Sequence, residues 1–225
     1  MKKEEMTIKE LFDTHKTMAG DYLARYTWPW EVLPHIGEIV KELGEKLPKE
    51  EYEKRGEDIW IHKTVSLAPT ATVRGPVILG KDVEVRPGAF IRGNVLAGEG
   101  CVVGNSTELK NVILFDRVQV PHYNYVGDSI LGYRSHMGAA SLTSNVKSDK
   151  TLVKVHGEDG DIETGLKKFG AAIGDYVEVG CGSVLNPGTV VGRHTNIYPL
   201  SSVRGCVGSN SIYKREGNVA EKEER

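Results

Sequence analysis

The sequence predicts a mainly β protein built as a β-helical solenoid, interrupted once and preceded by a short helical segment. An apolar or small residue returns at every sixth position through residues 61–109, and the series resumes at residue 173. The first series is Ile61, Leu67, Val73, Leu79, Val85, Ile91, Ala97, Val103 and Leu109, and the second is Ile173, Val179, Leu185, Val191, Ile197 and Val203. A period of six is neither helical nor a plain strand alternation, and repeats of this length are typical of β-helical solenoids.

The first part of the chain differs in texture, and we expect residues 1–58 to form an N-terminal helical cap and connector. Thr7 and Glu10 have the spacing of a capping box, and apolar residues recur at helical intervals before and after Pro34. We expect two amphipathic helices that cap the open end of the first coil, because a bare terminal repeat would expose apolar surface and unpaired strand edges. Trp28 and Trp30, between these helices, are more typical of packing than of a ligand-stacking surface.

The solenoid itself is expected to occupy residues 59–212, with short strands separated by turns that contain Gly, Pro and Asn. The six-residue count slips by one at Val126 and Gly127, which indicates a local bulge where a side chain is re-aimed. Residues 146–168 lack the repeat and are expected to form an insertion loop, either a lid over a pocket or a surface excursion. Residues 213–225 are expected to be a solvated tail.

The composition indicates a soluble cytoplasmic protein. The net charge is -2, which gives no argument for nucleic acid or an acidic membrane surface as a partner. No apolar run approaches the roughly 20 residues needed to span a bilayer, and the opening residues lack a secretory apolar region. Cys101, Cys181 and Cys206 are odd in number and form no CxxC pair. Cys101 falls on an inward-facing series, so we expect a small buried residue there, and we expect no metal site.

One long stretch carries a specific resemblance. Residues 104–145, GNSTELKNVILFDRVQVPHYNYVGDSILGYRSHMGAASLTSN, resemble the acetyltransferase half of N-acetylglucosamine-1-phosphate uridyltransferase / glucosamine-1-phosphate N-acetyltransferase. The most specific block is GN-x(2)-E-x-K followed by H-x(2)-YVGD. The resemblance implies a left-handed parallel β-helix with three faces per coil, a homotrimer with sites between subunits, and acetyl-CoA as co-substrate. The GGxGTR-type loop of the nucleotidyltransferase half does not occur in the sequence, so we expect no pyrophosphorylase activity.

The same resemblance supplies candidates for catalysis. It gives His122 the role of general base, which takes a proton from a sugar amine as the amine attacks the thioester. Imidazole, with an ordinary pKa near ~6.5, suits that step, and base catalysis is typically worth ~10²–10⁴-fold. Asn145 matches a family residue that contacts the sugar, and its amide can orient the amine or steady the developing oxyanion, although Asn is also common as a turn residue. Tyr125 matches a residue that contacts the sugar.

Cations are the candidates for phosphate binding. Lys110 and Arg92 are eighteen residues apart, which in a three-faced solenoid stacks them on adjacent coils of one face. Two stacked cations suit a sugar phosphate, and the family's phosphate-binding Lys and Arg fall at these positions. Arg86 is a competing candidate for the Arg role. Lys168 falls at the position of a family Lys that reaches the neighbouring subunit's ligand.

Two positions depart from the family pattern. His136 stands where the family has a sugar-binding Asn, and Val146 stands where it has Tyr. These changes suggest a different amino sugar or a lost activity, and His136 would add a second titrating group to the substrate site. For the thioester cofactor the resemblance points to the later coils, and the candidates are Cys181, Pro199, Ser201, Lys214 and Arg215.

The predicted function is a CoA-dependent N-acyltransferase that acts on an amino sugar 1-phosphate, such as glucosamine 1-phosphate, or on a sugar nucleotide. One alternative is a metal enzyme like the γ-class carbonic anhydrases, faintly echoed by IRGN at 91–94, but the close His pair that they need is absent. The other alternative is a non-catalytic trimeric sugar-nucleotide-binding or scaffold protein that partners a separate nucleotidyltransferase. The departures at His136 and Val146 favour it, whereas the retained polar set speaks against it.

Overall fold

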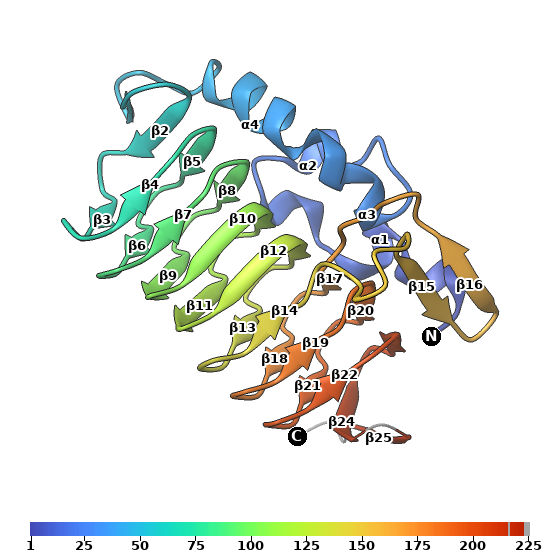
Figure 1. Cartoon of the computed structure of the whole chain (residues 1–225). Helices are drawn as coiled ribbons and strands as arrows, with labels where there is room; N and C mark the ends of the chain where they lie inside the picture. Colours follow the sequence, from blue (N-terminus) through green and yellow to red (C-terminus); the bar gives the residue numbers. More distant parts are fainter. Residues whose placement is uncertain (216, 223–225) are drawn as a thin grey trace.

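The computed structural model describes residues 1–215 and 217–222, which form a parallel β-helix with a helical segment along one side (Figure 1). Within the solenoid, successive coils pair through parallel strands: Val77 lies opposite Val95, and Val95 lies opposite Val112. The strands fall into three faces, called here the first, second and third face. The predicted mainly β class, a left-handed hexapeptide-repeat solenoid, is confirmed.

The strands of each face follow one another along the solenoid axis. The first face contains β2 (Ile59–His62), β5 (Val77–Leu79), β8 (Val95–Ala97), the second halves of β10 (Glu108–Leu114) and β12 (Tyr125–Leu131), β17 (Ala171–Ile173), β20 (Thr189–Val191) and β23 (Cys206–Val207). The second face contains β3 (Ser66–Leu67), β6 (Glu84–Val85), β9 (Val102–Asn105), β11 (Gln119–His122), β13 (His136–Met137), β18 (Glu178–Val179), β21 (Asn196–Ile197) and β24 (Ser211–Arg215). The third face contains β4 (Thr72–Val73), β7 (Phe90–Ile91), the first halves of β10 and β12, β14 (Leu142–Thr143), β19 (Val184–Leu185) and β22 (Ser202–Val203).

The inward residues of the repeat form a continuous core. Leu79, Ile91 and Val103 are fully buried, and burying an aliphatic side chain of this size stabilises a fold by about 1.5–3 kcal/mol. The coils approach each other so closely that Gly104 has no room for a side chain, since a Cβ there would lie 1.5 Å from the carbonyl oxygen of Pro121 on the next coil. The residues of the six-residue series are thus the ones whose side chains point into the core of the solenoid.

The corner between the third and the first face shortens in the middle of the solenoid. Ile91 lies opposite Leu109, but Val95 lies opposite Val112, so the corner loses one residue between these coils. The next coil keeps the short corner, and β10 and β12 run through it without a break. The bulge predicted at Val126 and Gly127 is therefore wrong: the local change is a corner with one residue fewer, and it begins one coil earlier.

The N-terminal segment lies along the first face and does not cap the end of the solenoid, so the predicted cap is wrong (Figure 1). Its elements are η1 (Lys3–Met6), α1 (Ile8–Leu11), η2 (Thr14–Lys16), α2 (Gly20–Leu23), α3 (Pro29–Val32), η3 (Leu33–His35), α4 (Ile36–Gly44) and β1 (Tyr52–Lys54). The outer side chains of the first face, such as Ile78, Leu96 and Ile113, are fully buried. Apolar surface that needs cover therefore runs down the side of the solenoid, and α4 packs on β5, β8 and β10 there.

The first predicted helix is broken into short turns. Thr7 does cap α1, with its hydroxyl accepting from the Glu10 amide at 3.3 Å. Phe12 then takes an extended backbone and packs against Phe115 of the solenoid, with the two rings tilted and their centroids 5.1 Å apart. Helical turns this short are marginal by themselves, so packing on the solenoid decides the local conformation.

The insertion and the chain end also form strands. The insertion folds into a hairpin of β15 (Lys154–Gly157) and β16 (Gly160–Glu163), and the N-terminal amine pairs with Glu158 in its turn. The hairpin contacts the N-terminal segment and also β20 and β23 of the solenoid. The two alternatives expected for the insertion, a lid over a pocket and a surface excursion, both stay predictions. Residues expected as a solvated tail instead include β24 and β25 (Asn218–Glu221), which pair antiparallel. Residues 216 and 223–225 of that predicted tail lie outside the described residues.

Candidate functional site

Charged side chains gather on the outer surface of the third face. Phe90 lies opposite Glu108, so Arg92 and Lys110 are stacked on adjacent coils as the spacing predicts. Arg92 Nη1 donates to Glu108 Oε1 at 2.6 Å, and this bond raises the pKa of the guanidinium. Lys110 Nζ donates to both oxygens of Asp128, at 3.0 and 3.2 Å. Each cation keeps further N–H groups for a ligand.

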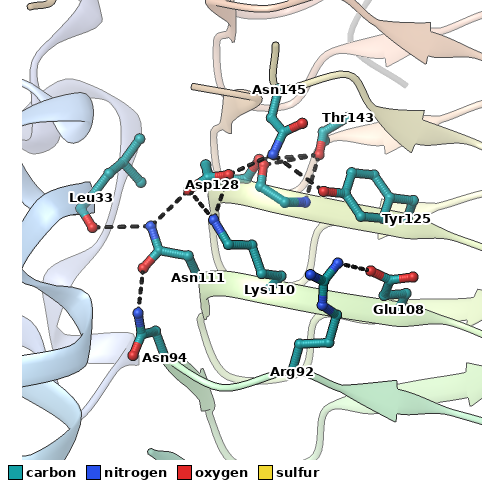
Figure 2. Close-up of polar contacts among 12 residues, drawn as sticks. Leu33, Arg92, Asn94, Glu108, Lys110, Asn111, Tyr125, Asp128, Thr143 and Asn145 are labelled. Carbon is teal, nitrogen blue, oxygen red and sulfur yellow. Dashed lines mark hydrogen bonds and ion pairs between the residues drawn. The ribbon is translucent and has the colours of Figure 1, made fainter. Parts of the chain in front are cut away.

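Asp128 is the centre of this group (Figure 2). Besides Lys110, it accepts from Asn145 Nδ2 at 2.5 Å and from Asn111 Nδ2 at 3.0 Å. Its side chain is 6% exposed, so the charge is stabilised by these donors and not by water. We call Arg92, Glu108, Lys110, Tyr125, Asp128 and Asn145 the third-face cluster.

Three corner residues connect the cluster to the N-terminal segment by hydrogen bonds. Asn94, Asn111 and Asp128 occupy the same corner of successive coils, each with a left-handed backbone, which Asn and Asp adopt more readily than other side chains. Asn94 Nδ2 donates to Asn111 Oδ1 at 3.3 Å, and Asn111 Nδ2 donates to the carbonyl oxygen of Leu33 at 3.1 Å. The cluster is thereby connected to the segment that covers the first face.

Tyr125 contributes a neutral hydroxyl. Asn145 Nδ2 donates to the Tyr125 oxygen at 3.2 Å. Burial and the nearby charges of Asp128 and Glu108 raise the pKa of this phenol above its usual value near ~10. The hydroxyl therefore keeps its proton at neutral pH and can donate to a ligand oxygen.

His122 lies at the opposite corner of the third face, between the second and third faces. Its ring is exposed, and the residue precedes Tyr125 by three positions. His122 and Asn145 thus lie toward opposite ends of the third face, and the Tyr125 hydroxyl between them accepts a hydrogen bond from Asn145. Within one chain the two predicted catalytic residues mark opposite ends of one surface.

Two of the predicted cofactor residues share the His122 corner. Backbone bonds connect the successive coils there: Ala140 N donates to His122 O, Gly182 N to Ala139 O, and Leu200 N to Cys181 O. Cys181 and Pro199 therefore continue the corner on the later coils, and both are exposed. Ser201 lies beyond this corner but is buried, and its hydroxyl donates to Tyr198 O at 2.7 Å.

The remaining predictions do not join the third-face cluster. His136 lies on the second face and pairs with Glu178 at 2.8 Å, in a groove that Arg117 and Arg134 also line. Arg86 also lies off the cluster and binds Glu84 at 2.9 Å. Lys168 follows the insertion and is exposed. Lys214 and Arg215 are exposed on β24, at the end of the solenoid.

Sequence reasoning missed Asp128, Glu108 and Asn111. Asp128 ends the block H-x(2)-YVGD, and Asn111 follows Lys110 directly, so both stand inside the stretch with the family resemblance. The available signal was chemical, since a Lys and an Asn predicted to face a ligand need an acceptor that orients them. The meeting of Asn111 and Asp128 at one corner depends on the shortened coil, which the six-residue period alone does not predict.

Trp30 and Cys101 lie where the sequence predicts them, in the packed interior. Trp30 is buried and lies 5.9 Å from the Phe169 ring, as expected for packing. Cys101 is fully buried, as expected, and donates to the Phe115 carbonyl. Within the described part of the chain, no group of three or more His, Cys, Asp or Glu side chains is arranged to hold a metal ion. No helix there is long and apolar enough to cross a membrane.

The fold and the cluster define a hexapeptide-repeat β-helix domain with a charged outer face. Residues 73–171, which contain the whole cluster, match the family described as the GMPPB C-terminal domain. The chain is 34% identical over 112 residues to the bifunctional sugar-1-phosphate nucleotidylyltransferase/acetyltransferase of Sulfurisphaera tokodaii, a match that covers 50% of this chain and 28% of that protein. It is 34% identical over 119 residues to the bifunctional protein GlmU of Methanocaldococcus jannaschii, covering 52% of this chain and 29% of that one. The matched segment is thus similar to one part of these bifunctional proteins, and the match covers less than a third of their length.

Further similarities are to shorter or more distant proteins. The uncharacterized acetyltransferase YaiX of Escherichia coli is 29% identical over 117 residues, covering 52% of this chain and 51% of that one. Among solved structures, a hexapeptide transferase family protein from Anaplasma phagocytophilum is 15% identical, covers 73% of this chain and 78% of its own, and has a TM-score of 0.41. A perosamine N-acetyltransferase mutant from Caulobacter crescentus, in complex with CoA and GDP-perosamine, is 14% identical over 74% of this chain and 57% of its own, with a TM-score of 0.34.

Proposed function

We propose that this protein is a CoA-dependent N-acyltransferase that transfers an acetyl group to an amino sugar 1-phosphate, such as glucosamine 1-phosphate, or to an amino sugar nucleotide. The observation that carries the proposal is the third-face cluster: two stacked cations, a neutral phenol and an amide on successive coils, with His122 at the far corner of the same face. The name of the Sulfurisphaera tokodaii relative, which combines sugar-1-phosphate nucleotidylyltransferase with acetyltransferase, supports the same acceptor class.

Arg92 and Lys110 would bind the phosphate of the acceptor. Both side chains are partly exposed, at 44% and 27%, so a phosphate can reach them without rearrangement of the core. A phosphate group carries two negative charges and can pair with the guanidinium of Arg92 and the ammonium of Lys110 together. It therefore suits this pair of cations better than the single charge of Glu108 or of Asp128 does. Tyr125 and Asn145 would then contact the sugar ring between the phosphate and the amine.

His122 would act at the amine. An imidazole that is exposed at the edge of the face can accept a proton from the amine as the nitrogen attacks the thioester carbonyl. The new C–N bond forms, the C–S bond of the tetrahedral intermediate breaks, and the CoA thiolate leaves and takes up a proton. Holding both reactants in register on a rigid solenoid accounts for much of the expected rate gain.

The CoA molecule would lie along the His122 corner. Cys181 and Pro199 are exposed on that corner one coil apart, and Lys214 and Arg215 stand at the end of the solenoid where CoA phosphates need cations. The buried hydroxyl of Ser201 is bonded internally, so only its backbone remains a candidate contact. We assign Asn145 to the acceptor and not to the oxyanion, because its Nδ2 already donates to Asp128.

The experiment is thiol release from acetyl-CoA by the purified protein with a panel of acceptors: glucosamine 1-phosphate, galactosamine 1-phosphate and UDP-linked 4-amino sugars. We expect release with one acceptor and a loss of at least about a hundredfold in His122→Ala. Release that is unchanged in His122→Ala would remove this residue as the base. Acceptor binding without release by the wild type would instead favour a non-catalytic sugar-nucleotide-binding protein.

A further inference from the structure

We propose that Asp128 is a positioning residue of the acceptor site, which fixes the side chains of Lys110 and Asn145 and is itself fixed by the N-terminal segment. This inference rests on the proposed function, because it assigns a task within the same site. Figure 2 shows the carboxylate at the meeting point of donors from three directions. Lys110 approaches from the third face, Asn145 from the next coil and Asn111 from the corner.

An ionised carboxylate only accepts hydrogen bonds, and this fact determines how its neighbours point. Asn145 must direct its Nδ2 group toward Asp128, so its Oδ1 atom is turned outward (Figure 2). None of the hydrogen bonds among residues 1–215 and 217–222 uses that Oδ1 atom. It is therefore presented as an acceptor for an N–H or O–H group of the sugar.

The same carboxylate holds Lys110 in one place. A free Lys side chain samples many rotamers, and ordering it on binding lowers affinity for the ligand. Contact with both oxygens of Asp128 removes that freedom in advance, while the ammonium keeps a third N–H for a phosphate oxygen. Lys110 is 27% exposed, so this N–H is accessible from solvent.

Asn111 fixes Asp128 in turn. Its Nδ2 group donates both to Asp128 Oδ1 at 3.0 Å and to the Leu33 carbonyl oxygen at 3.1 Å. Its Oδ1 atom accepts from Asn94, so the orientation of the amide is determined on both sides. The segment that covers the first face thereby supports the acceptor site, although it contributes no side chain to it.

The test compares steady-state kinetics of Asp128→Asn with acceptors that do and do not carry a phosphate. An Asn side chain can donate as well as accept, so it no longer dictates the orientation of Asn145 or holds Lys110. We expect KM for glucosamine 1-phosphate to rise about tenfold or more with kcat within about threefold, and the rise to be smaller for unphosphorylated glucosamine. A purely structural role would not distinguish the two acceptors.

The matched control is Asp175→Asn. Asp175 is also a buried carboxylate, which accepts from the amides of Asp13 and Tyr133, each at 2.7 Å, and pairs with Arg193. We expect this variant to lose thermal stability and to keep the KM of the wild type. If Asp128→Asn does not fold, Asn111→Ala cuts the connection to Leu33 and should raise KM in the same direction by a smaller factor.

The outcomes separate this inference from the proposed function. Turnover by the wild type together with an unchanged KM in Asp128→Asn overturns the positioning role alone. If the wild type binds glucosamine 1-phosphate without turnover, the calorimetric affinities of the wild type and of Asp128→Asn are compared in place of KM. Equal affinities of the two proteins then overturn the positioning role. If the wild type binds none of the amino sugar 1-phosphates, the UDP-linked amino sugars or inorganic phosphate, both proposals are wrong.

Discussion

Burial of single thiols decides which cysteines can react. Burial raises the pKa of Cys101 and of Cys206 to about 12, whereas Cys181 is exposed. At about pH 8 we therefore expect an aromatic disulfide reagent to modify Cys181 promptly in the native protein, and the other two thiols only after unfolding. Time courses with and without denaturant measure this difference, and equal rates for all three thiols in the native protein would contradict it.

The raised pKa values of Cys101 and Cys206 also predict how the free energy of unfolding changes at alkaline pH. A raised pKa means that the folded state keeps the proton more tightly than the unfolded state does. The stabilisation by this effect is complete below the ordinary thiol pKa near ~9 and is lost as the pH rises toward about 12. The free energy of unfolding should accordingly fall across that alkaline range, and a Cys101→Ala variant should show a weaker dependence.

At the scale of elements, the six-residue period predicted the coils but not what covers them. The period follows inward residues, so the strands and the stacking of Arg92 on Lys110 could be derived from spacing. The covering of the first face depends on outer residues such as Ile78 and Leu96. The triplets VIL and VLA carry that signal, because strands that are apolar on both sides must be buried on both sides. Chain order alone led to the wrong expectation of a terminal cap.

The candidate site was predicted only in part for a related reason. Arg92, Lys110, Tyr125 and Asn145 fall on one surface because the repeat fixes their coil positions. Asp128, which Lys110 and Asn145 both contact, is reached only through the shortened corner, where the register changes from eighteen to seventeen residues. A loss of one residue within a turn has no fixed sequence signature, and packing of the N-terminal segment on that corner is a long-range effect.

At the scale of the whole molecule, the second and third faces of the solenoid remain for contacts with other chains. The N-terminal segment occupies the first face, while Tyr123, Tyr198 and Leu200 expose 65%, 46% and 85% of their surface at or beside the His122 corner. Exposed apolar side chains on one edge are typical of an interface. We expect a homotrimer formed through the second and third faces, with a mass by light scattering of three times the 24.7 kDa chain. The mass of a single chain would contradict it.

The central claim is that the third face binds the acceptor through its phosphate. The most direct test is the calorimetric affinity for glucosamine 1-phosphate of the wild type, Lys110→Ala and Arg134→Ala. Both variants lose one positive charge, but Arg134 lies in the groove of the second face, away from the cluster. We predict that Lys110→Ala weakens binding about tenfold or more, the loss of roughly 1.4 kcal/mol expected for one charged hydrogen bond, and that Arg134→Ala binds like the wild type. Equal losses in the two variants, or a loss in Arg134→Ala alone, would contradict the assignment of the site to the third face.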